Sequence, residues 1–557
     1  MNSLWFSRFS VTVLWLVGFF VLFNILKWIF LKKGKAAAKF FISLIVSIGG
    51  GVKGNSGISN FISRHPALAK FLKQRVDRSK FSGLMFSILS LVVLYAVSSF
   101  VGTAIDVFIV GNVLSVDSSL ANLLAAFRNP LLVKIFLWVT ILGNWRLVAI
   151  IMLVVLILFW LWHKKNYIAP FLVSVGGGFV TGAIGKYVWH RPRPMEVAIY
   201  IEKSWSFPSG HAILAVSLYG FLIYFFWKYF KRWKNKTDAL FLGLLVIILI
   251  GFSRLYLGVH YSSDVWAGYM IGLFWLTLGI GLVESKKTIL SSPENDSALL
   301  CFTKSCLAKL GLYKAIQPKH LKIITGGLLC LLAVVYIGYG LKYKPLYNLG
   351  GDEDITKKVE YANAGQIFTD YQLPKFTETL LGNLQEPVSF IVIADNDEQL
   401  IKSFRKANWH LADNGSFRSL ITAFKLQVLN KAYPTAPMTP YFWQTYTNDF
   451  GFQEPTEVNS ARYRHHARFW RTNFVTVAEK KIYVGITSLD TGVKWWGLTH
   501  KIKPDIDSER EYLFDALKSA SVVGAYEKAQ FVDPVLGKNF TGDQFFTDGK
   551  VYTIYLK

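Results

Sequence analysis

The stretch Arg146–Trp162, RLVAIIMLVVLILFWLW, decides the fold. Its one charged residue is the first, and every residue after it is apolar. A helix needs roughly 17 to 25 such residues to cross the hydrocarbon core of a bilayer. Comparable apolar runs occupy residues 11–30 and 239–252. The sequence therefore predicts a polytopic membrane protein.

Composition supports the same class. The chain has 557 residues, of which 52% are hydrophobic and only 17% are charged. Soluble globular domains carry about 25% charged residues. A purely soluble enzyme is excluded.

The apolar runs predict an all-α bundle with a six-helix core in residues 81–287. The stretch 118–144 is also apolar, but it carries Arg128, Pro130 and Lys134, and we expect it to lie along the membrane interface. The six core spans are expected at about 83–105, 146–162, 167–189, 211–229, 239–257 and 264–283.

Two further segments flank this core. Residues 1–80 combine a retained membrane anchor at about 11–30 with a basic segment that the positive-inside rule places in the cytoplasm. Residues 288–345 form a basic connector that leads into one more span, at about 323–340.

Charge is divided unevenly along the chain. Residues 351–557 hold 24 Lys and Arg against 25 Asp and Glu, so the net charge of +26 lies almost wholly in the membrane half. This distribution suits cytoplasmic loops and an anionic substrate at the membrane, and it argues against nucleic-acid binding.

The loop charges also predict an orientation. Basic clusters at 163–165, 231–236 and 286–287 fall on one side of the core, which we take as cytoplasmic. Span parity then places the C-terminal region on the outer face of a bacterial inner membrane, although Lys342 and Lys344 favour the opposite side.

Residues 346–557 predict a soluble α+β domain. Strand-like runs such as VSFIVIA (388–394) and VYTIYLK (551–557) alternate with helix-like runs such as DEQLIKSFRKA (397–407). The three cysteines (Cys301, Cys306 and Cys330) all precede this region, so no disulfide can link it internally.

Three polar motifs interrupt the apolar core: KYVWHRPRP (186–194), FPSGH (207–211) and SRLYLGVHYSSD (253–264). By the predicted topology all three open onto the outer face. Ionisable residues at the ends of membrane helices are costly and mark a site by default. The set offers no plausible metal cage.

The cations of these motifs suit an anion. Arg193 and Arg254 carry planar forks that match phosphate oxygens, and Lys186 adds a point charge. Ser209 and Gly210 open the next helix, where unpaired backbone N–H groups favour an anion.

The remaining groups suit proton transfer and nucleophilic attack. His260 and Asp264 are four residues apart, so a helix beginning near His260 would bring them into contact. The carboxylate would orient the imidazole of a nucleophile or base, and His211 could protonate a departing oxygen. His190 and Arg191 either contact substrate or anchor headgroups. Together the groups predict a phosphoryl-transfer site.

The motifs K-x6-RP, PSGH and SR-x5-H-x3-D, in this order, resemble the signature of the type 2 phosphatidic acid phosphatase superfamily over about residues 81–285. The resemblance implies a six-helix bundle, no metal or other cofactor, and hydrolysis through a phosphohistidine on His260. Asp264 would activate His260 and His211 would protonate the leaving group. Phosphate would bind to Lys186, Arg193, Ser209, Gly210 and Arg254.

The C-terminal region resembles the LssY-like domain through ANWHLAD, YRHHARFW, GLTHKI and DIDSERE. That family implies no settled activity. His465 and His466 are adjacent, and on a strand they would point to opposite faces, which weakens a shared metal site with His500 and Asp505. Ser508 and Glu511 have capping-box spacing and predict a helix start.

The expected function is a membrane lipid phosphate phosphatase acting on a phosphorylated membrane lipid. Undecaprenyl pyrophosphate, phosphatidic acid, phosphatidylglycerol phosphate and a lipid A-like phosphate all remain open as substrates. So do two alternatives: a phosphotransferase with a lipid or sugar acceptor, and a non-catalytic envelope scaffold. The sequence does not indicate an oligomeric state.

Overall fold

The protein is described by a computed structural model that divides into two compact units. One unit comprises residues 19–111 and 133–347, and the other residues 1–18, 112–132 and 348–557. Apart from a few isolated positions, the described residues are 20–36, 63–76, 81–126, 130–290, 318–342, 357–359, 365–413, 433–439, 441–460, 463–494, 499–539 and 542–557.

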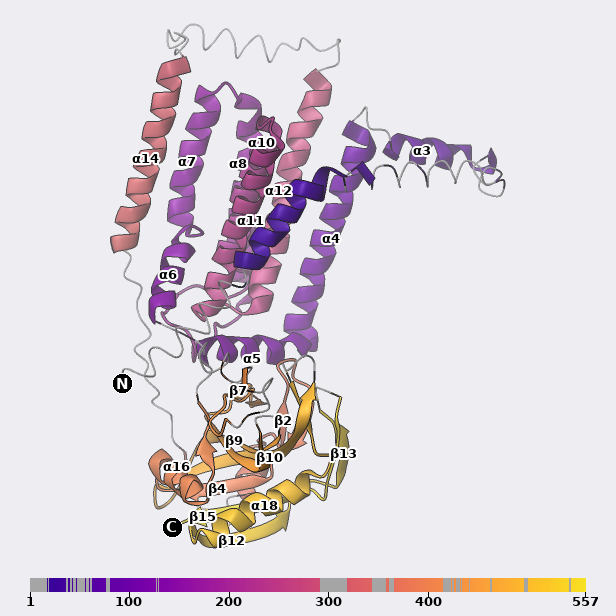
Figure 1. The fold of residues 1–557 in the computed structure, drawn as a ribbon. Coiled ribbons are helices and arrows are strands. Elements are labelled where there is room, and N and C mark those ends of the chain that lie inside the picture. The colour runs from indigo at the N-terminus through magenta and orange to yellow at the C-terminus, as the bar shows by residue number, and fades with distance from the viewer. Residues whose placement is uncertain are drawn as a thin grey trace. The chain divides into compact units, whose positions relative to one another are not determined.

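The first unit is a bundle of long helices that run side by side (Figure 1). Six helical segments among the described residues are long and apolar enough to cross a membrane, which confirms the predicted membrane fold. These are Phe81–Val110, Lys165–Trp189, Gly210–Tyr229, Trp233–Tyr256, Ser262–Ser285 and His320–Lys342.

The helices of this unit are α3 (Pro66–Val76), η1 (Phe81–Met85), α4 (Phe86–Ile105), η2 (Asp106–Val110), α6 (Pro130–Ile141), α7 (Trp145–Leu161), η3 (Lys165–Tyr167), α8 (Ile168–Trp189), α9 (Gly210–Leu214), η4 (Ala215–Tyr219), α10 (Gly220–Tyr229), α11 (Trp233–Tyr256), α12 (Ser262–Leu290) and α14 (Pro318–Lys342).

The predicted span 146–162 is only part of a longer feature. α7 continues from α6 across a short break with a bend of 46°, and the pair passes the test for a membrane span together. Asn144 caps α7 by accepting a hydrogen bond from the backbone N–H of Arg146 at 3.0 Å. Residues 130–141, part of the stretch expected at the interface, form α6, which buries Leu132 and Phe136 and is joined to α7 as a broken span or a re-entrant segment.

The N-terminal segment packs along α11. Residues 20–36 are helical, and Phe30 stacks on Trp233 with ring centroids 5.4 Å apart. Lys27 forms an ion pair of 2.6 Å with Asp238. Most of residues 11–19, where the predicted anchor begins, lie outside the described residues, as do Cys301, Cys306 and residues 291–317 of the connector.

Close packing of α12 against α9 depends on two glycines. A Cβ atom on Gly268 would lie 2.6 Å from the backbone oxygen of Ser209, and one on Gly272 would lie 2.7 Å from that of Ile213. Only glycine allows this backbone approach. The start of α9 and the first turn of α12, which carry two of the polar motifs, are thereby held together.

The second unit contains the predicted α+β domain, and its main sheet has nine strands. The strand order is β12-β15-β4-β10-β9-β8-β5, with β1 beside β9 and β11 beside β10; β4 and β15 are parallel, as are β1 and β9. The strands are β1 (Lys357–Val359), β2 (Phe376–Glu378), β3 (Leu384–Pro387), β4 (Phe390–Ala394), β5 (His410–Leu411), β6 (Phe442–Trp443), β7 (Tyr446–Thr447), β8 (Phe450–Ser460), β9 (Tyr463–Thr476), β10 (Lys481–Lys494), β11 (Thr499–Ile502), β12 (Val523–Gln530), β13 (Val535–Lys538), β14 (Gln544–Thr547) and β15 (Lys550–Leu556).

The main sheet separates two apolar cores. One face packs against α16 (Asp397–Lys406) and α18 (Ile506–Ser519) through residues such as Phe404 and Leu513. The other face packs against α15 (Gln366–Asp370) and the Tyr441–Trp443 segment. The strand-like and helix-like runs named from the sequence correspond to β4, β15 and α16.

Helix α5 (Asn112–Ala126) belongs to this second unit although it precedes α6 in the chain. The side-chain amide of Asn122 donates to the backbone oxygen of Thr445 at 3.1 Å and to its hydroxyl at 2.9 Å. A segment between two membrane helices is thus attached to the C-terminal domain.

Candidate active site

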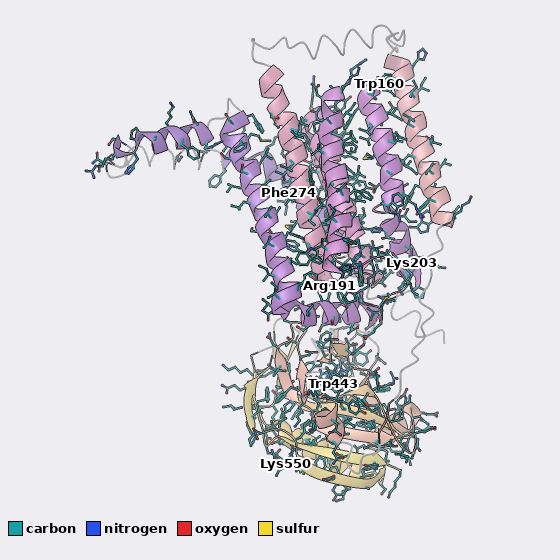
Figure 2. The ribbon with its side chains drawn as sticks, turned by 180° about the vertical axis from the view of Figure 1, so that it is seen from behind. Trp160, Arg191, Lys203, Phe274, Trp443 and Lys550 are labelled. Carbon is teal, nitrogen blue, oxygen red and sulfur yellow. The ribbon has the colours of Figure 1, made fainter. Side chains whose placement is uncertain are left out.

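The three polar motifs meet at one end of the helical bundle. The first ends α8 and enters the loop 190–209, the second begins α9, and the third joins α11 to α12. Figure 2 shows Arg191 and Lys203 at this end and Trp160 at the other. Phe207, which is fully buried, fixes the loop between Phe108 and Trp189.

Arg193 and Arg254 converge on one carboxylate. Both guanidinium groups form ion pairs with Glu202, at 2.7 Å for Arg193, and Tyr200 donates to the same carboxylate at 3.3 Å. Arg254 is fully buried and also donates to the hydroxyl groups of Thr140 and Tyr200, at 2.7 and 2.6 Å. The two predicted phosphate-binding arginines therefore share an anion position, which Glu202 holds.

The other predicted phosphate-binding residues lie beside this position. Lys186 donates to the backbone oxygen of Trp205, and its Cε lies 3.9 Å from where a side chain on Gly210 would begin. Ser209 is fully buried, and its hydroxyl has no hydrogen-bond partner among the described residues. Buried hydroxyls are nearly always hydrogen-bonded, so this orphan donor fits an anion such as phosphate.

His260 and Asp264 are in contact, as their spacing predicts. Nδ1 of His260 lies 3.3 Å from Oδ2 of Asp264, and both side chains are buried. On the other side of the ring, Nη1 of Arg193 lies 3.2 Å from Nε2.

These contacts select one tautomer of His260. Arg193 can only donate, so Nε2 must accept, and the ring proton must be on Nδ1, where Asp264 accepts it. Burial, followed by the charge of Arg193, holds the pKa of His260 well below its usual range. The imidazole is neutral near pH 7, with its Nε2 lone pair toward the arginines.

Sequence reasoning missed the role of Arg191. Its guanidinium donates to Oδ1 of Asp264 at 2.7 Å and to the hydroxyl of Ser263 at 2.7 Å, and it is buried. It is therefore neither a headgroup anchor nor free to bind substrate. In an extended segment, residues two positions apart point to the same side. The spacing of Arg191 and Arg193 after α8 was therefore the sequence signal that both side chains face the site. The other uncertain residue, His190, is exposed and packs on Trp205.

Further contacts were also missed. Ser206 donates to Asp264 and lies 3.3 Å from Nδ1 of His260. The one sequence signal for Glu202 was the scarcity of acidic residues, of which only ten precede position 351. Although burial alone would raise the pKa of Glu202, the charges of Arg254 and Arg193 and an interaction with His211 hold it well below its usual range. His211 thus belongs to the same electrostatic cluster.

The two adjacent histidines of the C-terminal domain do not share a site. His465 and His466 leave opposite faces of β9, as predicted: Nδ1 of His465 lies 2.8 Å from Glu509 on α18, whereas Nδ1 of His466 lies 3.3 Å from Asp490 on β10. His500 stands on β11 opposite Val493.

The predicted cap of the following helix was wrong. α18 begins at Ile506, and the Asp505 side chain accepts the backbone N–H of Ser508 at 3.1 Å. Asp505 is the better cap because it directly precedes the first helical residue, whereas Ser508 lies in the first turn. Among the described residues no group of three or more His, Cys, Asp or Glu is arranged to hold a metal ion.

Both halves of the chain match known families. Residues 167–287 match the profile of the PAP2 superfamily, and residues 370–551 match that of the LssY C-terminus. Both predicted resemblances are confirmed.

Three relatives illustrate the match. Phosphatidylglycerophosphatase B of Bacillus subtilis (strain 168) is 29% identical over 176 residues, which cover 31% of this chain and 86% of that protein. The undecaprenyl-diphosphatase of Sulfolobus acidocaldarius is 29% identical over 124 residues, which cover 20% and 53%. The crystal structure of a transmembrane PAP2-type phosphatidylglycerolphosphate phosphatase from Bacillus subtilis is 26% identical and covers 34% of this chain and 94% of that chain, with a TM-score of 0.32.

The chain spans most of the first relative and about half of the second. The names of the first two relatives are those of phosphatases, which confirms the predicted enzyme class.

Proposed function

We propose that the chain is an integral membrane phosphatase that hydrolyses a lipid phosphate through a phosphohistidine on His260, without a metal. The supporting observation is that the Arg193 guanidinium contacts both the Glu202 carboxylate and Nε2 of His260. A phosphate that replaces the carboxylate on Arg193 and Arg254 would therefore lie beside the nitrogen lone pair.

The reaction has two steps. Nε2 of His260 attacks phosphorus, the bond from phosphorus to the lipid oxygen breaks, and His211 gives that oxygen a proton. Water then attacks the phosphohistidine, returns its proton to His211 and releases inorganic phosphate. Asp264, held by Arg191, accepts a hydrogen bond from the Nδ1–H group of His260 and stabilises the positive ring formed by attack.

The anion pocket lowers the barrier by placing fixed positive charge around the phosphate. Arg193 and Arg254 supply paired donors, Lys186 adds a third cation, and the Ser209 hydroxyl and the backbone N–H of Gly210 complete the set. These assignments rest on the shared anion position and on the orphan Ser209 hydroxyl.

The substrate class is the phosphomonoester or pyrophosphate of a membrane lipid. The named relatives act, by their names, on phosphatidylglycerophosphate and on undecaprenyl diphosphate. Both compounds place a phosphate at the membrane surface, which fits a site at the ends of membrane helices.

We also propose that the site and the C-terminal domain occupy the outer face of a bacterial inner membrane. From the loop 190–209, the described candidate spans Gly210–Tyr229, Trp233–Tyr256, Ser262–Ser285 and His320–Lys342 return the chain to the same side. Between α5 and the loop 190–209 the chain crosses twice, once through the α6–α7 pair and once through Lys165–Trp189. Helix α5, which binds the C-terminal domain, is therefore on the same side as the loop. Protease added outside sealed spheroplasts should cleave the C-terminal domain, and protection there would reverse the orientation.

A panel of purified lipid phosphates tests the function. Wild type should release phosphate from at least one lipid, His260→Ala should release none, and His163→Ala, at the opposite end of the bundle, should match wild type. Equal release by wild type and His260→Ala would contradict the proposal. Circular dichroism on each purified variant separates lost chemistry from lost folding.

A further inference from the structure

The turn between β2 and β3 exposes apolar side chains that the proposed phosphatase reaction does not use. It comprises residues 379–384 (TLLGNL) and is called the β2–β3 turn below. Leu381 is 63% exposed and Leu384 is 65% exposed, and the turn holds no ionisable residue. A single exposed leucine is common on a soluble domain, whereas neighbouring exposed leucines in an uncharged turn indicate a contact surface.

The backbone of the β2–β3 turn satisfies its own hydrogen bonds. The N–H of Thr379 donates to the backbone oxygen of Asn383 at 2.9 Å, and that of Gly382 donates to the backbone oxygen of Thr379 at 3.0 Å. The Thr379 hydroxyl accepts two more N–H groups, those of Leu381 at 3.2 Å and Asn383 at 3.1 Å. Unpaired backbone groups are costly in lipid. These internal bonds therefore prepare the turn to leave water.

The β2–β3 turn packs against a helix that is tied to the membrane. Helix α5 begins at Asn112, and only Gly111 separates it from the candidate span Phe81–Val110, so the two helix ends are no more than about 7 Å apart. A Cβ atom on Gly382 would lie 2.5 Å from the hydroxyl oxygen of Ser115, in the first turn of α5. The turn thus lies beside the part of α5 that is nearest to the span.

The charges around the turn are compatible with a lipid surface. The carboxylate of Glu378, which precedes the turn, accepts the backbone N–H of Thr445. Lys538 lines the same groove as Leu381 and Leu384, whose volume is about 580 Å³. A lysine beside apolar side chains suits the membrane interface, because its stem packs among apolar groups while its amine reaches the headgroups.

We infer that the β2–β3 turn is a membrane-docking surface, which inserts Leu381 and Leu384 into the boundary between headgroups and acyl chains of the bilayer that the chain spans. The attachment to α5 makes this contact intramolecular, so two leucines suffice where a free domain would need a larger surface. The C-terminal domain thereby keeps one face toward lipid. The inference does not depend on the proposed phosphatase reaction or on which side of the membrane carries the domain.

The test measures whether this turn is in lipid or in water. The full chain is reconstituted into phosphatidylcholine vesicles, and Leu381→Cys and Leu384→Cys each carry a nitrobenzoxadiazole fluorophore. Nitroxide groups on the lipid acyl chains quench a label in the membrane, and iodide on both sides of the vesicle quenches a label in water. The background removes the native thiols by Cys301→Ala, Cys306→Ala and Cys330→Ala.

Val477→Cys, labelled in the same way, is the matched control. Val477 is 58% exposed in the turn between β9 and β10, where the adjacent sequence contains Glu479 and Lys480. Because charged side chains oppose entry into lipid, this label should stay in water.

The nitroxide lipid should quench the labels at 381 and 384 but not the label at 477. Insertion by about 5–10 Å removes a label from water, so iodide should quench the two turn labels at least threefold less than the control. Iodide quenching equal to the control, without quenching by the nitroxide lipid, would overturn the inference. Protection from iodide without quenching by the nitroxide lipid would also overturn it, since a protein surface would then cover the turn.

A second measurement needs no substitution. A phosphatidylcholine with a diazirine in its acyl chain is activated in vesicles that contain the unmodified chain, and the crosslinked peptides are mapped by mass spectrometry. Crosslinks should include residues 379–384 and exclude residues 477–480. Absence of crosslinks to residues 379–384, with crosslinks present in the membrane spans, would overturn the inference.

Discussion

Replacing Glu202 by Gln tests whether its carboxylate competes with substrate phosphate for Arg193 and Arg254. The ion pairs lie in a buried setting, with side-chain exposures of 4% and 0% for the arginines and 21% for Glu202. A hydrogen bond to a charged group contributes about 1.5–3 kcal/mol, against about 0.5–1.5 kcal/mol for a neutral one. Losing the charge on two such bonds should ease displacement by about 2 kcal/mol.

Since every 1.4 kcal/mol is tenfold, inorganic phosphate should bind Glu202→Gln roughly thirtyfold more tightly than wild type. The assay is the inhibition constant of inorganic phosphate against turnover of a short-chain lipid phosphate. Because the arginines hold the pKa of Glu202 well below its usual range, the carboxylate stays charged, and the difference should be constant from pH 5 to pH 8.

Glu196→Gln is the matched control, since it removes the same charge from an exposed position in the same loop. It should leave phosphate inhibition within about twofold of wild type, because exposed charges interact weakly. If Glu202→Gln bound phosphate equally or more weakly than wild type, the carboxylate would be organising the arginines rather than competing with phosphate.

Three more outcomes are expected. Arg254→Lys should lower kcat/KM by about tenfold to a hundredfold, since a point charge replaces a fork that donates to Thr140, Tyr200 and Glu202; steady-state kinetics with less than a twofold loss would argue against the clamp. The acid limb of kcat/KM should lie below pH 6.5, because the pKa of His260 is lowered and its neutral form attacks; a limb at higher pH would contradict the lowered pKa of His260. EDTA should leave phosphate release unchanged, and a loss restored by a divalent cation would contradict the metal-free mechanism.

The site could be predicted from sequence where spacing alone determines geometry. Four residues of separation at the start of α12 bring Asp264 to His260. Glu202 could not be found this way. It lies in an irregular loop without periodicity, and only the folded chain shows it between two arginines that are 61 residues apart.

Hydropathy understated the apolar face of α6 for a different reason. Arg128, Pro130 and Lys134 lower the apolar score of this stretch, yet Lys134 is exposed while Leu132 and Phe136 are buried. Hydropathy averaged over a window of residues does not distinguish the two faces of a helix, and it does not report that α6 and α7 meet at 46°. Thr140, which contacts Arg254, was therefore overlooked.

In the C-terminal domain, the alternation of side chains along a strand predicts which face each residue points to, but it does not predict a function. Adjacency on a strand correctly separated His465 from His466. The same rule groups Arg464, His466 and Arg468 on one face, but the burial of that face depends on residues distant in sequence, such as Thr439 and Tyr441, which contact Arg468.

The central claim is that phosphate passes through His260, and rapid-quench trapping of the phosphoenzyme tests it most directly. Purified protein mixed with a lipid substrate bearing radiolabelled phosphate should yield a protein-bound label that survives alkali and is lost in acid, as a phosphoramidate bond requires. Peptide mapping should place the label on His260, and His260→Ala should carry none. A label on another residue, or full turnover with no bound label at any quench time, would contradict the account.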